Sequence, residues 1–460
     1  MIPILFSSIE FLYYFLPVVV GIYFLLPKTG RNGWLFFASL FFYGWGEPKN
    51  LVLMLLSILS FYLLGLAMGT GKGRRFWLIL GITLGIGLLA IFKYGNFAVE
   101  NINFLLGLSL PLPGLTLPIG ISFYTFQLLS YLIDVYRDRV EPQRSFIDFG
   151  CYVVLFPQLI AGPIVRYIDV DRQLKERQIT ADDFQLGVQR FLMGLGKKIL
   201  IANQLGAFVE IFRSSGEKSV LFYWLYALAF SLHIYFDFSG YSDMAIGIGR
   251  IFGFRFPENF DYPYISASVQ EFWRRWHMSL GGWFRDYLYI PLGGSRTSRG
   301  KWLRNVLIVW LFTGLWHGAA WNFVVWGLFF AGLLLLEKQV PGFKKLPRPL
   351  RHCYVLVMVV LSFVIFNANG MNQALADLAA LFGFAGLPLS STETVYYLRS
   401  YLVIFVIAIV GCLPFPKNYV NRLEPKFLRF VQPIAMAALL LMCTAYLIDG
   451  SFNPFLYFRF

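Results

Sequence analysis

The chain has 460 residues, of which 58% are hydrophobic, 19% aromatic and only 14% charged, and its formal net charge is +14. An ordinary soluble domain has about 25% charged residues, and a soluble fold has too little interior to bury so much apolar surface. The composition therefore excludes a soluble globular enzyme, a disordered chain and a secreted disulfide scaffold, and it predicts an all-α polytopic membrane protein.

Apolar runs recur along the whole chain and predict its helices. The clearest runs cover residues 11–26, 51–68, 76–92, 115–133, 220–236, 354–366, 401–413 and 435–447. Shorter or interrupted runs lie between them, at residues 34–45, 149–164, 192–205 and 302–336, the last broken near His317. Interrupted helices survive at membrane depth only where protein or a water-filled cavity covers them. We therefore expect re-entrant and interfacial helices beside the membrane spans.

Basic residues gather in short loops and indicate an orientation in the membrane. These loops are residues 28–31, 72–75, 137–144, 166–177, 338–351 and 417–429. The positive-inside rule places them in the cytoplasm, and the parity of the spans then places the N-terminus outside. Contact with lipid head groups accounts for the excess positive charge, so nucleic acid is not an expected partner. Because no linker and no internal repeat divides the chain, we predict a single domain over residues 1–460.

His317 is the first candidate for chemistry, because it interrupts an otherwise apolar helix pair. A neutral imidazole can take the proton of a hydroxyl that attacks a carbonyl. We expect Trp316 and Trp321 to wall the space around it. Gly314 and Gly318 would let the backbone approach a substrate closely. The alternative is a structural histidine that is hydrogen-bonded to a neighbouring helix, and the residues alone leave both open.

A second cluster of aromatic and charged side chains surrounds His277, which follows Arg274 and Trp276. One interpretation is an interfacial helix whose tryptophans and arginines lie at head-group depth. The other has His277 near His317 in space, where it orients His317 or a substrate. Ionisable residues beside membrane-length apolar segments suggest function by default, but the sequence does not decide between these interpretations.

Three more charged residues follow His277. Arg285, Asp286 and Arg296 either pair with one another or hold an anionic donor such as a pyrophosphate. The four cysteines are scattered without paired spacing, so we predict no metal site. The candidate site thus has two catalytic candidates and eight flanking residues. The catalytic candidates are His317 and His277, and the flanking residues are Trp316, Trp321, Asn322, Trp276, Arg274, Arg285, Asp286 and Arg296.

Three motifs in this region follow one another in a distinctive order. They are Phe-Trp-Arg-Arg-Trp-His at residues 272–277, Trp-Phe-Arg-Asp-Tyr-Leu-Tyr-Ile-Pro-Leu-Gly-Gly-Ser-Arg at 283–296 and Gly-Leu-Trp-His-Gly at 314–318. The succession resembles the membrane-bound O-acyltransferase family, most closely its bacterial alginate O-acetyltransferase branch. Stretches at 41–48, 118–124 and 156–163 are similar to that branch too, so the resemblance extends from the first fifty residues to about Lys338.

The resemblance implies a fold and an activity. The fold would be a ring of tilted transmembrane helices around a central tunnel, in the bacterial cytoplasmic membrane. His317 would lie where funnels from both faces meet, with His277 as the second polar position. The activity would be acetyl transfer from cytoplasmic acetyl-CoA, without a bound cofactor, to an extracytoplasmic hydroxyl. The acceptor would belong to a partner acetyltransferase, or to the exopolysaccharide or cell-wall polymer that is finally modified.

In the implied mechanism, His317 acts as the general base, and His277 or a nearby Trp or Asn N–H stabilises the oxyanion. Three alternatives remain. One is D-alanyl transfer to teichoic acid, which the related D-alanyl transfer proteins perform. Another is a transporter of a polysaccharide or lipid-linked precursor, which would tolerate substitution of His317. The last is a non-catalytic scaffold, which has no need of His317 and its flanking residues.

Overall fold

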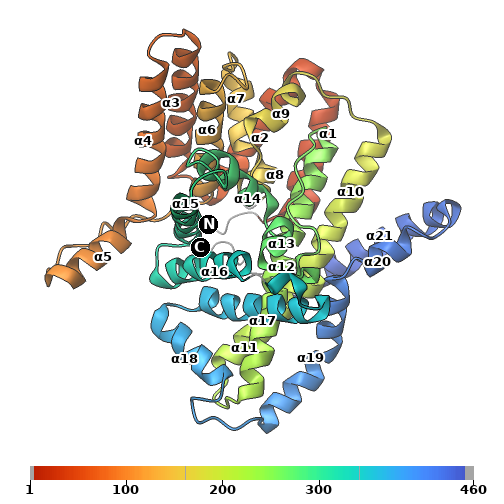
Figure 1. The fold of residues 1–460 in the computed structure, drawn as a ribbon. Helices are drawn as coiled ribbons and strands as arrows, with labels where there is room; N and C mark the ends of the chain where they lie inside the picture. The colour runs from red at the N-terminus through yellow and green to blue at the C-terminus, as the bar shows by residue number, and fades with distance from the viewer. Residues whose placement is uncertain (1–4, 161, 341, 451–460) are drawn as a thin grey trace. The chain divides into compact units, whose positions relative to one another are not determined.

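The computed structural model describes residues 5–160, 162–340 and 342–450. Within these ranges the secondary structure is helical, with no strand (Figure 1). Seven of the described helices are long and apolar enough to cross a membrane. They are α3 (Leu51–Gly69), α4 (Arg74–Phe92), α12 (Val220–Ile251), α16 (Trp321–Gln339), α17 (Arg348–Asn367), α19 (Thr392–Gly411) and α21 (Pro425–Ile448). The protein is therefore an all-α, multi-pass membrane protein.

The length of these spans matches a bilayer. A helix of 19 residues, such as α3 or α4, is about 28 Å long at 1.5 Å per residue, close to the thickness of the hydrocarbon core. The spans differ in how far other helices cover them. Within its most apolar window α12 is 72% buried by protein, whereas α19 is 17% and α21 only 6% buried. Protein therefore covers most of α12, whereas α19 and α21 are largely exposed, as lipid-facing spans are.

The remaining helices are shorter or irregular. The α-helices among them are α1 (Leu16–Leu25), α2 (Arg31–Gly46), α5 (Gly95–Leu106), α6 (Ile121–Tyr136), α7 (Phe146–Val154), α8 (Phe156–Leu159), α9 (Tyr167–Lys175), α10 (Ala181–Gly196), α11 (Asn203–Ser214), α13 (Val269–Arg275), α14 (Met278–Phe284), α15 (Arg299–His317), α18 (Met371–Leu381) and α20 (Phe415–Val420). Wider π-helical turns occur at η1 (Phe11–Phe15), η3 (Lys197–Ala202) and η5 (Arg285–Tyr289), and short 3-10 turns at η2 (Lys28–Gly30), η4 (Pro263–Ile265) and η6 (Phe343–Lys345).

The predicted interruptions are confirmed. The run 149–164 contains the end of α7 and the short α8, and the run 302–336 is divided into α15 and α16 after His317. The run 192–205 contains the π-helical turn η3 at its two lysines. One apolar run is not helical from its start. The run 115–133 becomes helical only at Ile121, because Pro118 restricts the residue before it and Gly120 adopts a left-handed backbone with φ of +74°.

The contacts within the chain divide it into two compact units. Unit 1 comprises Met1–Phe191 and Tyr241–Glu258, and unit 2 comprises Leu192–Gly240 and Asn259–Phe460. The division falls inside α10 and α12, which each contribute residues to both units. The single domain over residues 1–460 stays a prediction, and each unit is described by itself.

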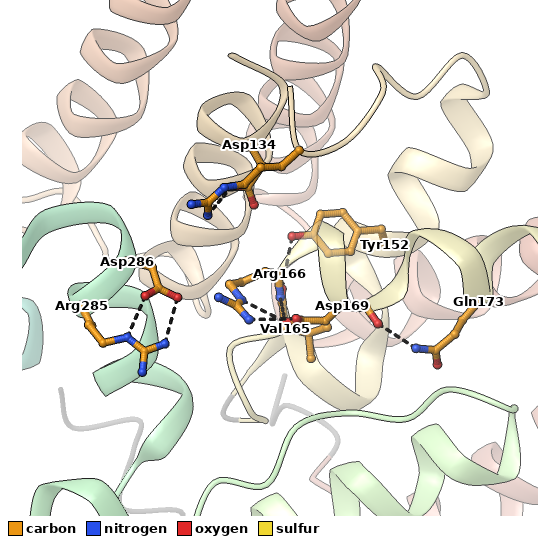
Figure 2. A network of polar contacts seen from close by, with 9 residues as sticks. Asp134, Tyr152, Val165, Arg166, Asp169, Gln173, Arg285 and Asp286 are labelled. Atoms are coloured by element: carbon orange, nitrogen blue, oxygen red, sulfur yellow. Dashed lines mark hydrogen bonds and ion pairs between the residues drawn. The ribbon is translucent and has the colours of Figure 1, made fainter. Parts of the chain in front are cut away.

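A network of polar contacts fixes the loop and helix that follow the motif at 156–163 in unit 1 (Figure 2). The guanidinium and backbone N–H of Arg166 donate to the carboxylate of Asp169 at 2.9–3.1 Å, which caps α9. The Gln173 amide donates to the Asp169 carbonyl at 2.7 Å, and the Tyr152 hydroxyl donates to the Val165 carbonyl at 3.2 Å. These bonds satisfy backbone N–H and carbonyl groups of residues 165–169 and hold α9 against the end of α7.

Unit 2 has a large aromatic core. Its buried members come from α11, α12, α13 and α15 to α19, and they include Tyr226, Phe272, Trp326, Phe330 and Phe363. Lys198 and Asp237 form an ion pair inside this unit, and the side chain of each is only 2% exposed. A lysine within an apolar helix is costly unless an opposite charge compensates it, so this pair explains how η3 tolerates Lys198.

Candidate active site

His317 is the last residue of α15 in unit 2. The next residue, Gly318, is fully extended, and the chain enters α16 at Trp321. The two helices pack against each other and thus form a hairpin with His317 at its turn. The imidazole is 8% exposed. A polar ring is therefore held at a break between two apolar helices, as the sequence predicts.

Aromatic rings surround the His317 imidazole. The ring centroid of Trp326 lies 4.9 Å away and that of Phe366 lies 5.4 Å away, both nearly perpendicular to the imidazole. The neighbouring Trp316 ring lies at 5.0 Å. Trp316 and Trp326 are 4% and 1% exposed. These contacts make the surroundings of His317 apolar, which strengthens electrostatic interactions with any group that reaches it.

The glycines beside His317 serve the packing of α15 on α16, whereas we expected them to let the backbone approach a substrate closely. A Cβ at Gly314 would lie 2.3 Å from the carbonyl oxygen of Phe323, and a Cβ at Gly318 would lie 2.2 Å from the ring of Phe323. The same close approach is seen from the other helix, where a Cβ at Gly327 on α16 would lie 2.3 Å from the carbonyl oxygen of Trp310 on α15. Small residues of this kind let two membrane helices approach closely.

His277 occupies the turn between α13 and α14, with an unusual left-handed backbone (φ of +46°). The side chain is 1% exposed. Its Nδ1 lies 3.1 Å from Asn259 Oδ1, and its buried Nε2 has no hydrogen-bond partner in the described part of the chain. His277 lies outside the seven candidate spans, and burial lowers the pKa of its imidazole to about 3. The ring is therefore neutral near neutral pH.

The two histidines share a neighbour in unit 2. The ring centroid of His277 lies 5.9 Å from that of Trp316, which in turn contacts His317. The ring of Phe238 also contacts His277, with its centroid at 4.6 Å and nearly perpendicular to the imidazole. The structure thus brings both candidate histidines to one aromatic cluster, which we call the histidine cluster: His277, His317, Trp316, Trp326, Phe238 and Phe366.

Polar groups at this cluster have unused hydrogen-bonding capacity. The buried Nε1–H of Trp326 has no partner among the described residues, and the same holds for the Nε1–H of Trp273, whose ring lies 5.7 Å from that of Trp326. Buried donors of this kind are rare in folded proteins and call for an explanation. The Trp326 ring contacts His317, so its N–H is a candidate donor to a polar ligand at this place.

Asn322 has a structural task, although it lies close to the cluster in sequence. It is 1% exposed, and its amide group donates to the carbonyls of Ile365 and Ala368 at 3.3 and 3.0 Å. Both amide hydrogens are therefore used in holding the end of α17 against α16. The idea that an Asn side chain at this place stabilises an oxyanion is not supported by this geometry.

The remaining predicted residues are spread more widely. Trp276 is buried against Phe272 and Phe260, so its ring is covered by protein. Trp321 is 54% exposed and Arg274 is exposed. Neither side chain belongs to the histidine cluster as defined.

The charged residues of the second motif are placed near one turn. Arg285 donates to the carboxylate of Asp286 at 2.7 Å, so these two pair with each other (Figure 2). The guanidinium is 64% exposed, and Arg296 is exposed too. Gly293 and Gly294 have φ of +106° and +58°, so the backbone makes a tight turn here. Exposed guanidiniums here are compatible with an anionic ligand.

Sequence reasoning missed Asn259 and Trp326. Asn259 lies 18 residues before His277 in an irregular segment, and no spacing rule links them. Trp326 follows His317 by nine residues across a helix break, among tryptophans that look alike in sequence. Across the described ranges, no group of three or more His, Cys, Asp or Glu residues is placed to hold a metal.

Comparison with known proteins shows to which family the chain belongs. The model of the membrane-bound O-acyltransferase family matches residues 137–374, more than half of the chain, and this range includes both histidines. A "probable alginate O-acetylase AlgI" of Azotobacter vinelandii is 39% identical, and the match covers 99% of this chain and all of that protein. The chain belongs to the membrane-bound O-acyltransferase family. It is therefore an enzyme, an O-acyltransferase, as its motifs indicate.

Two other members of the family help to place the chain. The peptidoglycan O-acetyltransferase of Helicobacter pylori is 32% identical, over 99% of this chain and 98% of that protein. The teichoic acid D-alanyltransferase of Bacillus subtilis is 28% identical, over only 54% of this chain and 67% of that protein. The similarity to both O-acetyl-transferring relatives thus extends over nearly the whole chain, whereas the similarity to the D-alanyltransferase does not.

Proposed function

We propose that this membrane-bound O-acyltransferase transfers an acetyl group from acetyl-CoA in the cytoplasm to a hydroxyl outside the membrane. The hydroxyl belongs to an extracytoplasmic partner acetyltransferase or to an exopolysaccharide or cell-wall polymer. Supporting this proposal, the relatives that match almost the whole chain are named for O-acetylation of alginate and of peptidoglycan. The ring of helices around a central tunnel belongs to the same proposal.

The observation that carries the proposal is the histidine cluster. It combines a buried imidazole, His317, with an indole N–H of Trp326 that has no partner among the described residues. Acyl transfer needs a base for the attacking hydroxyl and a hydrogen-bond donor for the oxyanion that forms. A transporter or a scaffold needs neither of them.

The reaction then takes the following course. The imidazole of His317 removes the proton of the acceptor hydroxyl as its oxygen attacks the thioester carbonyl. The Nε1–H of Trp326 donates to the carbonyl oxygen as negative charge develops on it. The carbon–sulfur bond breaks, the new ester remains on the acceptor, and the imidazolium returns its proton to the CoA thiolate.

The orientation follows from the charged loops. Basic loops such as residues 166–177 and 338–351 lie in the cytoplasm of a bacterium by the positive-inside rule, and the N-terminus lies outside. Positive charge on the cytoplasmic face attracts the anionic CoA. The exposed Arg285 and Arg296 are the residues that we assign to its phosphates, since guanidinium groups bind phosphate well.

The identity of the acyl donor distinguishes acetyl transfer from D-alanyl transfer. Membranes that contain the protein and an acceptor polysaccharide are supplied either with radiolabelled acetyl-CoA or with a D-alanyl carrier protein. We expect the label of acetyl-CoA to enter an alkali-labile ester, and the carrier protein to transfer nothing. Labelling from the D-alanyl carrier alone would replace the acetyl assignment, and movement of the polysaccharide without any new ester would indicate a transporter.

The role of Trp326 has its own test. Trp326→Phe keeps an aromatic ring beside His317 but removes the Nε1–H. Loss of one oxyanion donor costs about 100- to 1,000-fold in kcat, so we expect a loss of that order in acetyl transfer with a KM within about threefold of the wild type. Trp224→Phe is a matched control, because its Nε1 donates at 3.0 Å to the carbonyl of Leu381 and not at the cluster. Equal kcat in the two variants would exclude Trp326 as the donor.

A further inference from the structure

Asn259 braces the turn that carries His277. Its side-chain oxygen Oδ1 lies 3.3 Å from the backbone N–H of Ser279, 2.9 Å from the Ser279 hydroxyl and 3.1 Å from His277 Nδ1. Its backbone carbonyl accepts the N–H of Met278 at 2.9 Å. Asn259 is 1% exposed. One buried residue thus contacts three consecutive residues at a left-handed backbone position, which needs support from its surroundings.

These contacts determine which ring nitrogen of His277 carries the hydrogen. A backbone N–H can only donate, so the Asn259 atom that faces Ser279 N must be the carbonyl oxygen and not the amide nitrogen. That oxygen can only accept, and therefore His277 Nδ1 must donate to it. A neutral imidazole has one hydrogen on its nitrogens, which leaves Nε2 with a lone pair.

The surroundings of the ring keep it neutral. The rings packed on His277 are those of Phe238 and Trp316, which carry no charge. Burial lowers the pKa of the imidazole, and among the described residues no charged neighbour contributes to the shift. Nε2 is buried and has no partner among the described residues. Nε2 can therefore accept a hydrogen bond but cannot donate one. This disfavours His277 as the group that stabilises the oxyanion.

We propose that Asn259 is a positioning residue for acyl transfer, which holds His277 in the Nδ1–H tautomer so that Nε2 accepts a hydrogen bond from an N–H or O–H group of the bound substrate. This inference rests on the proposed function. It divides the work at the cluster: His317 takes the proton, Trp326 donates to the oxyanion and His277 orients the substrate as an acceptor.

Two substitutions of Asn259 separate this role from a merely structural one. Asn259→Leu removes the acceptor, and we expect kcat to fall about 10- to 100-fold, the size of loss seen when a partner that orients a metal-bound histidine is removed. Asn259→Asp keeps every acceptor bond but adds a negative charge, which raises the pKa of His277. Because the protonated ring cannot accept, the acidic limb of the pH–rate profile should move to higher pH. Ser279→Ala, which leaves the contact with His277 intact, should stay within about twofold of the wild type.

The tautomer can be observed without any assay of activity. The chain has four histidines, and nitrogen-15 NMR of histidine-labelled protein, assigned with His277→Gln, reports which ring nitrogen is protonated. We expect Nδ1–H at His277 in the wild type and a mixture of tautomers in Asn259→Leu. Nε2–H in the wild type, or a pH profile of Asn259→Asp that superimposes on that of the wild type, would overturn the proposal.

The outcomes remain distinguishable if a variant or the proposed function fails. If Asn259→Leu does not fold, the pH profile of Asn259→Asp and the wild-type tautomer decide. If the wild type transfers no acetyl group, the proposed function is wrong, whereas the NMR result still shows whether Asn259 fixes the tautomer of His277.

Discussion

His317→Ala is expected to abolish acetyl transfer while the protein still accumulates in the membrane. Without the imidazole, the acceptor hydroxyl must attack with its proton still bound. General-base catalysis contributes about 100- to 10,000-fold to such a step, so the loss should be of that size. The acetyl content of the polysaccharide made by cells that carry the variant, divided by the amount of protein in their membranes, measures the effect.

His352→Ala is the matched control for this substitution. His352 is half-buried on α17, and its Nδ1 lies 3.0 Å from the carbonyl oxygen of Ser266, outside the histidine cluster. Its loss removes an imidazole from the same unit without touching His317. We expect acetylation within about twofold of the wild type. Acetylation at the wild-type level in His317→Ala would exclude His317 as the base.

Gly314→Ala should separate α15 from α16 and displace His317. The new Cβ would lie 2.3 Å from the carbonyl oxygen of Phe323 and 3.4 Å from the Cα of Val324. Both are backbone atoms, which cannot rotate away as the end of a side chain can. Overpacking of this kind costs about 1–3 kcal/mol, and sometimes more. We therefore expect a lower melting temperature in detergent and a loss of acetyl transfer of at least tenfold.

Gly332→Ala on α16 makes the same chemical change where there is room. Nothing lies within 4 Å of its Cβ, and alanine favours a helix over glycine by about 1 kcal/mol. This variant should melt at the wild-type temperature or slightly above it, with unchanged activity. If Gly314→Ala melts no lower than Gly332→Ala, the close approach of the two helices is not what holds His317 in place.

The helices could largely be predicted from the sequence, because a bilayer imposes one requirement on all of them. Apolar runs of sufficient length mark the spans, and charged or broken runs mark the exceptions, such as the division of 302–336 at His317 and the π-helical turn at Lys197–Ala202. The start of α6 at Ile121 was missed because hydropathy does not register the local backbone restrictions at Pro118 and Gly120.

The candidate site could be located from sequence but not assembled from it. The motifs singled out His277 and His317, and the structure adds that both contact Trp316. No described residue accepts the N–H of Trp326, and this depends on distances in space that the sequence does not give. The bond between Asn259 and His277 joins an irregular loop to a helix start, and no periodicity connects such positions.

Purified protein in lipid vesicles, supplied with acetyl-CoA labelled in its acetyl group and with an acceptor that bears free hydroxyls, measures the transfer step itself. We expect the wild type to form a labelled, alkali-labile ester and to release one CoA thiol for each ester, and we expect His317→Ala to leave the label on CoA. Formation of the labelled ester by His317→Ala at the wild-type rate would contradict the role of His317 as the general base.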